Sequence, residues 1–283
     1  MEKVDRKTGK AYQVTNPKGA DFLYGTFIGR IILKLITNKV TANIVRWHFS
    51  KKWSIPRINR TIKEYNIDMS LFENKDYQNF NEFFLRRKKN LKIDMDKTHF
   101  ISPCDSKLIV YKLNRESAFD IKGSKYSVNE IINKDLLDYN NGYALVFRLE
   151  VMDYHHYHFI DDGTMDEYKS IKGCLHAVLP IAFKKYKVFH TNAREYTTLH
   201  TKNFGDVIEV EVGALNVGKI VNEKNIEKYR RGDEKGHFEF GGSTIILFVK
   251  ENKITIDNDI LLNSTLGKET IVSCGEKIGT KYK

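Results

Sequence analysis

The chain is poor in cysteine, with only 3 in 283 residues, at positions 104, 174 and 274. Cysteines this dispersed provide neither a disulfide framework nor the paired spacing of a structural zinc site. The absence of a disulfide framework agrees with a protein of a reducing compartment. Residues 1–18 are polar and lack the apolar core of a signal peptide. No internal repeat or low-complexity linker divides the chain. We therefore expect a folded protein that stays on the cytoplasmic side.

Long apolar runs are also missing. The segment Phe22–Thr37 contains Arg30 and Lys34 and is shorter than the roughly 20 apolar residues that a spanning helix needs. At helical spacing its apolar residues fall on one face: Tyr24, Ile28, Ile31, Ile32 and Leu35. The pattern predicts an amphipathic helix that lies in a membrane interface or packs on the protein's own core, and both can hold for different faces.

Positive charge is confined to the first third of the chain. Residues 1–100 hold 21 Lys and Arg against 10 Asp and Glu, whereas residues 101–283 hold 26 of each, so the net charge of +11 is N-terminal. Aromatic and basic residues interleave there as they do at the depth of lipid headgroups: Arg46, Trp47, Phe49, Lys51, Lys52 and Trp53. We expect an anionic membrane surface as partner. No nucleic-acid-binding motif is present, so we expect no nucleic acid partner.

Two glycines precede a serine at the start of an apolar run, in the order Gly241, Gly242, Ser243, Thr244 and Ile245–Val249. Glycine reaches backbone torsions that permit a sharp turn, so the Ser243 hydroxyl could attack the preceding carbonyl. An N-to-O acyl shift followed by elimination would cut the chain there and leave a pyruvoyl group. The same residues also form an ordinary turn into a hairpin strand.

Self-cleavage needs a general base and a group that orients it. Asp105, in "SPCDSK", is one candidate, although alone it is typical of a turn. Residues 153–159, "DYHHYHF", supply three histidines: on a helical turn His155 and His158 share a face, whereas on a strand His156 and His158 do. A zinc site made from these histidines would need a further ligand, so we predict no metal.

Ordered motifs extend along most of the chain: "NFNEFFLRR" (79–87), "SPCDSKL" (102–108), "IKGSKYSVNE" (121–130), "DYHHYH" (153–158), "TNAREY" (191–196), "VGALNVGKI" (212–220), "RGDEKGHFEFGGST" (231–244), "GKET" (267–270) and "GEKIG" (275–279). Together they resemble the phosphatidylserine decarboxylases, pyruvoyl enzymes of phospholipid synthesis. The resemblance implies a self-processing triad of Asp105, His158 and Ser243. Cleavage would fall between Gly242 and Ser243.

The resemblance also implies the products and the reaction. A large chain, 1–242, and a small chain, 243–283, would result, and Ser243 would become the covalent pyruvoyl cofactor. Phosphatidylserine would form a Schiff base with it and yield phosphatidylethanolamine and CO2, because the pyruvoyl group is an electron sink. His155 would assist decarboxylation or return a proton. The family pattern is broken at His156, where arginine is common, and at Ser106, where glycine is common.

Partners and location follow from this resemblance together with the N-terminal charge, the amphipathic pattern and the absence of a signal-peptide pattern. We expect phosphatidylserine in an anionic membrane, the two cleaved chains held together, a homodimer, and a peripheral position on the cytoplasmic face of the cell membrane. Two other functions share these features: a catalytically inactive lipid-binding relative, and a pyruvoyl-dependent decarboxylase of a soluble amino acid. The second of these functions would not need a basic, amphipathic N-terminal region.

Residues 22–90 are predicted to be rich in helix, and strands are predicted further on: Leu108–Tyr111, Tyr143–Leu149, Val207–Val212, Thr244–Val249 and Ile254–Ile256. The expected fold is α+β. It combines an antiparallel β-rich catalytic domain, residues 96–283, with an N-terminal basic, helical, membrane-docking region, residues 1–95.

Overall fold

The structure is a computed structural model that describes residues 2–14, 16, 19–121, 124–134, 139–183, 185–215, 219–224, 226–240 and 243–282. Its largest sheet has 11 strands: β1 (Glu2–Asp5), β2 (Ala11–Gln13), β4 (Ser106–Lys112), β7 (Tyr143–Leu149), β9 (Gly163–Met165), β10 (Lys169–Ile171), β11 (Arg194–Thr201), β12 (Gly205–Gly213), β14 (Lys228–Tyr229), β16 (Ser243–Val249) and β18 (Glu269–Val272). Their order is β14-β9-β11-β12-β16-β7-β4-β18-β1-β2, and β10 pairs with β11. The pairing is mostly antiparallel, with β1 parallel to β18.

Three smaller sheets complete the β structure of the described chain. One has the order β13-β15-β8, from β8 (His156–His158), β13 (Ile220–Asn222) and β15 (Glu234–Phe238). A second has the order β17-β19-β3, from β3 (His99–Ile101), β17 (Ile254–Ile256) and β19 (Lys277–Lys281). The third pairs β5 (Ala118–Ile121) with β6 (Ser124–Ser127).

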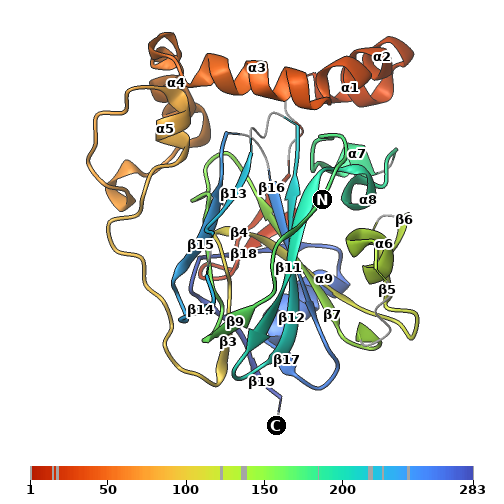
Figure 1. Ribbon diagram of the computed structural model, residues 1–283. Helices are drawn as coiled ribbons and strands as arrows, with labels where there is room; N and C mark the ends of the chain where they lie inside the picture. Colours follow the sequence, from red (N-terminus) through yellow and green to blue (C-terminus); the bar gives the residue numbers. More distant parts are fainter. Residues whose placement is uncertain are drawn as a thin grey trace.

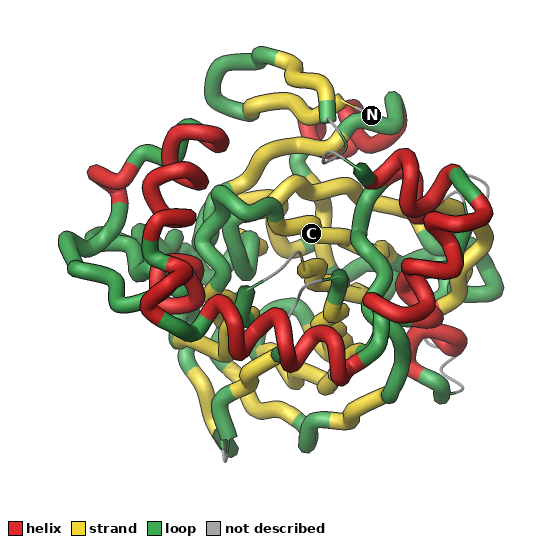
Figure 2. The backbone as a smooth tube through the Cα atoms, turned by 90° about the horizontal axis from the view of Figure 1, so that it is seen from above, coloured by secondary structure: helices red, strands yellow, loops and turns green. Residues whose placement is uncertain are grey.

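Helices gather in the N-terminal region: α1 (Ala20–Gly25), α2 (Phe27–Ile36), α3 (Lys39–Phe49), α4 (Pro56–Tyr65) and α5 (Phe80–Phe84), with short 3₁₀ turns at Lys52–Ser54 and Met69–Leu71. They form a layer across one end of the strands, at the end opposite the C-terminus (Figures 1 and 2). The remaining helices are α6 (Val128–Ile132), α7 (Pro180–Phe183), α8 (Val188–Thr191) and α9 (Asn258–Thr265).

The predicted α+β class and antiparallel strands are confirmed, but the single helix expected over Phe22–Thr37 is two helices. Thr26 is extended, and its hydroxyl accepts a 2.9 Å hydrogen bond from the N–H of Gly29, which caps α2. Tyr24 is buried and accepts a hydrogen bond from the N–H of Ala177, so part of the expected apolar face packs inward. No helix in the described ranges has both the length and the apolarity to span a bilayer.

The centre of the large sheet is β16, which is buried along its whole length. It pairs antiparallel with β12 on one side and with β7 on the other, so Ser243 lies opposite both Gly213 and Leu149. A separate cluster of buried residues joins the helical layer to the segment just before β16: Ile58, Ile67, Phe72, Phe80, Phe83, Phe84, Tyr154, Phe240 and Cys274. The strand register and this cluster together position the start of β16.

A buried charge cluster lies beside the sheet. The Lys235 ammonium contacts Glu211 and lies 3.5 Å from Glu209, and all three side chains are fully buried. Burial raises the pKa of Glu211 to about 7, an effect that Lys235 opposes and Glu209 adds to. Two carboxylates facing one ammonium leave one carboxyl group that prefers its proton.

We predict that Glu211→Gln becomes more stable relative to its parent as pH rises. The folded parent holds a proton on Glu211 that the unfolded chain releases above about pH 4.5, so its stability falls with pH up to about 7. Glu211→Gln lacks this loss of stability. Its free energy of unfolding should therefore rise by about 1–3 kcal/mol relative to that of the parent between pH 5 and 8. Urea unfolding measures this difference, with Ser243→Ala present in every protein so that the chain stays uncut. Glu64→Gln, at an exposed glutamate, is the control. A difference in the free energy of unfolding between variant and parent that stays constant with pH would contradict the prediction.

Candidate active site

Ser243 is the first residue of β16 and is completely buried. Its hydroxyl has no hydrogen-bond partner in the described part of the chain, and the same holds for Thr244. Gly241 and Gly242, which complete the predicted cleavage motif, lie outside the described residues. An unpaired buried hydroxyl costs about 1–3 kcal/mol, so its presence in a native fold calls for a chemical explanation.

His155 lies directly before β8 and is also completely buried. Its ring packs on Phe84 of α5 with 3.8 Å between centroids, and neither ring nitrogen has a partner among the described residues. Burial, assisted by the Arg86 guanidinium, lowers the pKa of His155 well below its usual value. His155 is therefore a neutral imidazole, and its two buried nitrogens have no partner in the described chain.

His158 is held by a backbone carbonyl. Its Nδ1 lies 2.9 Å from the Gly232 carbonyl oxygen, which only accepts, so Nδ1 carries the proton and Nε2 keeps its lone pair. Tyr154 lies 3.3 Å from Nε2 and donates to it. Burial lowers the pKa of His158, opposed by the Gly232 hydrogen bond. This is the protonation state that a general base requires.

Gly232 can orient its carbonyl because it is a glycine. Its φ of +85° lies in the left-handed region, and a Cβ there would come 3.0 Å from the Ile93 side chain.

The side chains of the "DYHHYH" motif divide between two faces. His156–His158 form β8, so the strand alternative is correct, and His156 and His158 share a face. The Tyr154 ring stacks beside both, 4.8 Å from His156 and 5.9 Å from His158. His155 instead packs on Phe84.

Asp105 has two other partners. Its carboxylate forms an ion pair with Lys88 at 2.6 Å and accepts a 2.7 Å hydrogen bond from the N–H of Cys274. The Lys88 ammonium lies 5.6 Å from the centre of the Tyr154 ring, and the N–H of His158 donates to the Pro103 carbonyl at 2.9 Å. The Asp105 and His158 segments are therefore neighbours.

Within the described chain, no hydrogen bond joins Asp105 to His158, and none joins either residue to Ser243. The triad of these three residues stays a prediction. The structure adds groups that sequence reasoning missed, namely the Gly232 carbonyl, the Tyr154 hydroxyl and Lys88. Tyr154 and Gly232 stand inside two of the quoted motifs, but a backbone carbonyl leaves no side-chain signal of its role.

Arg86 fixes the turn that leads to His155. It is 1% exposed, and one of its terminal nitrogens donates to the carbonyls of Met152 at 2.6 Å and Asp153 at 3.1 Å. Burial lowers the pKa of Arg86 to about 10, so it stays charged at neutral pH. The carboxylate of Asp153 is held in turn by buried Lys107, at 2.6 Å.

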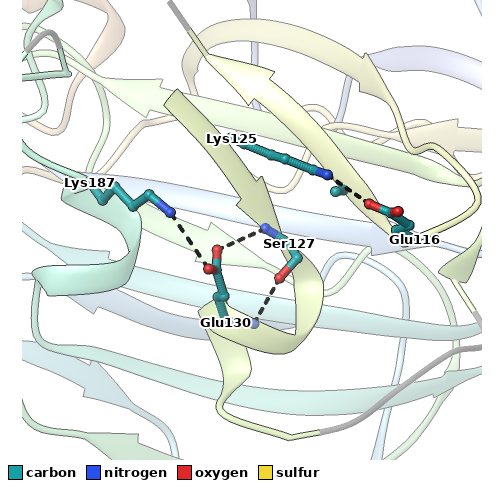
Figure 3. Close-up of a pocket in the computed structure, with 6 residues that line it drawn as sticks. Glu116, Lys125, Ser127, Glu130 and Lys187 are labelled. Carbon is teal, nitrogen blue, oxygen red and sulfur yellow. Dashed lines mark hydrogen bonds and ion pairs between the residues drawn. The ribbon is translucent and has the colours of Figure 1, made fainter. Parts of the chain in front are cut away.

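A surface pocket of about 340 Å³ lies elsewhere, between β5, β6 and α6 (Figure 3). Its charged groups are paired with one another: Lys125 with Glu116 at 2.7 Å, and Lys187 with Glu130 at 3.6 Å. None of the predicted site residues lines this pocket.

An α+β fold with a buried serine at the start of its central strand and two neutral histidines defines a candidate self-processing enzyme. The sequence model of the family described as phosphatidylserine decarboxylase matches residues 80–280. The chain belongs to this family, as the motifs indicated, and the family is one of decarboxylases.

Curated relatives agree over nearly the whole chain. "Phosphatidylserine decarboxylase proenzyme 2" of Clostridium acetobutylicum is 49% identical, covering 91% of this chain and 90% of its own length. The phosphatidylserine decarboxylase proenzyme of Clostridium botulinum (strain 657 / Type Ba4) is 44% identical, over 99% and 100%. That of Clostridium tetani is 39% identical, over 98% and 97%.

We predict that Arg86→Met destabilises the fold by about 2–3 kcal/mol, because it leaves the part-buried carbonyls of the 151–153 turn without the Arg86 donor. Urea unfolding on the uncut Ser243→Ala background measures the effect. Arg60→Met, at an exposed arginine of α4, is the matched control and should change stability by less than about 0.5 kcal/mol. Equal stability of the two variants would rule out the role assigned to Arg86.

Proposed function

We propose that this chain is a proenzyme that cuts itself between Gly242 and Ser243 and then converts phosphatidylserine to phosphatidylethanolamine and CO2. The observation that carries the proposal is the Ser243 hydroxyl, which is buried, without a partner in the described chain, and at the start of a central strand of a family member. The printed names of the relatives call them phosphatidylserine decarboxylase proenzymes.

Each histidine has a role in the proposal that fits its surroundings. His158 keeps a lone pair on Nε2, because the Gly232 carbonyl holds the proton on Nδ1, and it acts as the base for the Ser243 hydroxyl. Asp105 supports His158 indirectly: it pairs with Lys88, and the Lys88 ammonium lies over the Tyr154 ring, whose hydroxyl contacts His158. His155 contacts the substrate and donates the proton that replaces the lost carboxylate.

The site fits a pyruvoyl group at position 243. The Ser243 hydroxyl, which would be lost in forming the group, is completely buried and has no hydrogen-bond partner among the described residues. Once formed, the group supplies an electron sink for the decarboxylation of an amine-bearing substrate. Phe84, which packs on the His155 ring and contacts Phe240, excludes water from that side of His155.

The two cleaved chains stay together in this proposal because of the sheet. The small chain, 243–283, begins with β16, which pairs along seven residues with β12 and with β7, both in the large chain. β18 and β19 add pairs with β4 and β3.

Intact mass spectrometry under denaturing conditions tests the self-cleavage. Wild type should give two fragments that meet between residues 242 and 243, the smaller with an N-terminal pyruvoyl mass, and Ser243→Ala should stay whole. Ser106→Ala is the matched control, because it also removes a buried hydroxyl without a described partner yet should leave cleavage intact. A wild-type chain that stays whole, or a Ser243→Ala chain cut at the same bond, would refute the proposal.

The same proposal places the protein peripherally on the cytoplasmic face of an anionic membrane, with its helical layer as the docking surface. Support comes from large apolar side chains of this layer that are 49% to 72% exposed: Phe27, Ile28, Ile31, Leu35, Val40, Ile44, Trp47 and Trp53. Lys51 lies over the Trp47 ring at 5.4 Å, which places a cation beside the apolar group. Apolar side chains flanked by cations are suited to an anionic lipid interface.

We predict that the double variant Phe27→Asp, Leu35→Asp binds anionic vesicles at least tenfold more weakly, because each apolar side chain contributes about 1.5–3 kcal/mol when buried in lipid. Vesicle co-sedimentation measures the change. Leu262→Asp is the control, since Leu262 is 62% exposed on α9, outside the helical layer (Figure 1). Equal losses in both proteins would show that the helical layer is not the docking surface.

A further inference from the structure

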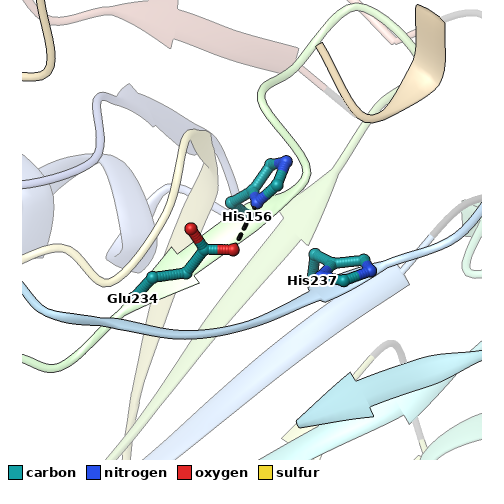
Figure 4. A group of neighbouring side chains, drawn as sticks. All are labelled: His156, Glu234 and His237. Atoms are coloured by element: carbon teal, nitrogen blue, oxygen red, sulfur yellow. Dashed lines mark hydrogen bonds and ion pairs between the residues drawn. The ribbon is translucent and has the colours of Figure 1, made fainter. Parts of the chain in front are cut away.

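A second polar cluster lies on β8 and β15, beside the proposed catalytic residues and formed by different side chains. His156 is paired with His237 across the two strands, and Glu234 stands three residues before His237 (Figure 4). One donor atom from each of the three side chains lies within 4.8 Å of the others. Two imidazoles and a carboxylate are a common ligand set for Zn²⁺.

Both ring nitrogens of His156 face hydrogen-bond acceptors. Its Nε2 lies 3.1 Å from the Leu85 carbonyl oxygen and its Nδ1 lies 2.6 Å from a Glu234 oxygen. Both neighbours are acceptors, and a neutral imidazole has only one N–H to offer. A metal ion bound by Nδ1 would meet the Glu234 carboxylate while the Nε2–H donates to the Leu85 carbonyl. Such an ion would supply a positive charge where the family commonly has arginine.

The groups around the cluster are arranged as outer partners of a metal site. Metal-binding histidines usually donate their other N–H to a carbonyl, as His156 Nε2 is placed to do to Leu85. Arg87 donates to the second Glu234 oxygen at 2.7 Å and, at the longer distance of 3.4 Å, to the first oxygen, which faces His156. His237 is half-buried, so the cluster is open to solvent and a water can be the fourth ligand.

We propose that His156, Glu234 and His237 bind one borderline divalent metal ion of the Zn²⁺ class, in contrast to the sequence-based prediction of no metal, which considered only the three histidines of residues 153–159. Tetrahedral coordination needs donor atoms roughly 3.3 Å apart, from metal–ligand distances near 2.0 Å. The Glu234 side chain and its partner Arg87, which is 53% exposed, can move to reach this spacing. The bound ion joins β8, which carries His158, to β15, which leads toward Ser243.

All three donors precede the proposed cleavage bond, so the cut and uncut proteins should both bind metal. The test is zinc content by elemental mass spectrometry after equilibrium dialysis against micromolar Zn²⁺, with the visible spectrum of Co²⁺-loaded protein as a report of geometry. His156→Arg restores the residue common in the family, which can pair with Glu234. His237→Gln is a second variant, at a half-buried position. His200→Gln is the control, because His200 also contacts two carboxylates, Asp166 and Asp206.

Wild type and His200→Gln should bind about one Zn²⁺ per chain and give tetrahedral Co²⁺ bands. His156→Arg and His237→Gln should bind at least tenfold more weakly and lose those bands. The proposal is overturned if both variants bind zinc as wild type does. It is also overturned if wild type binds no more zinc than His156→Arg.

Discussion

The two-sided pairing of β16 is the constraint on which the candidate site depends. Because β16 is hydrogen-bonded to β12 and β7 over its full length, the register that buries Ile245 also sets the position of Ser243. A slip of one residue would turn every side chain of the strand to the opposite face. The serine is thus held at a fixed place by seven paired residues, and a cut before it leaves those pairs intact.

The aromatic cluster connects the helical layer to this strand. Phe80 and Phe84 of α5 both contact Phe240, and Phe84 also covers the ring of His155. The same packing that joins the two regions therefore desolvates the histidine and keeps it neutral. The two His155 nitrogens have no hydrogen-bond partners in the described chain, which lowers the stability of the fold. The rest of the core offsets this cost. Buried polar groups left in this condition are typical of sites that bind a further group.

Much of the fold followed from sequence periodicity, and most of the site's contacts did not. The bounds of β7 and β17 coincide with the predicted ranges, since alternating or continuous apolar runs ended by turns define strands well. The helix break at Thr26 was missed because a threonine is compatible with both a helix interior and a cap. The Gly232 carbonyl that holds His158, and the meeting of His156 with Glu234 and His237, depend on the pairing of β8 with β15, which local sequence does not encode.

The processed chain is proposed to decarboxylate a lipid and not a soluble amino acid. The most direct measurement is the release of labelled CO2 from carboxyl-labelled phosphatidylserine in vesicles, compared with carboxyl-labelled free serine, using wild-type and Ser243→Ala protein. We predict release from the lipid only, and only by the wild type. No release from phosphatidylserine by a fully cleaved chain, or equal kcat/KM for free serine, would contradict the account.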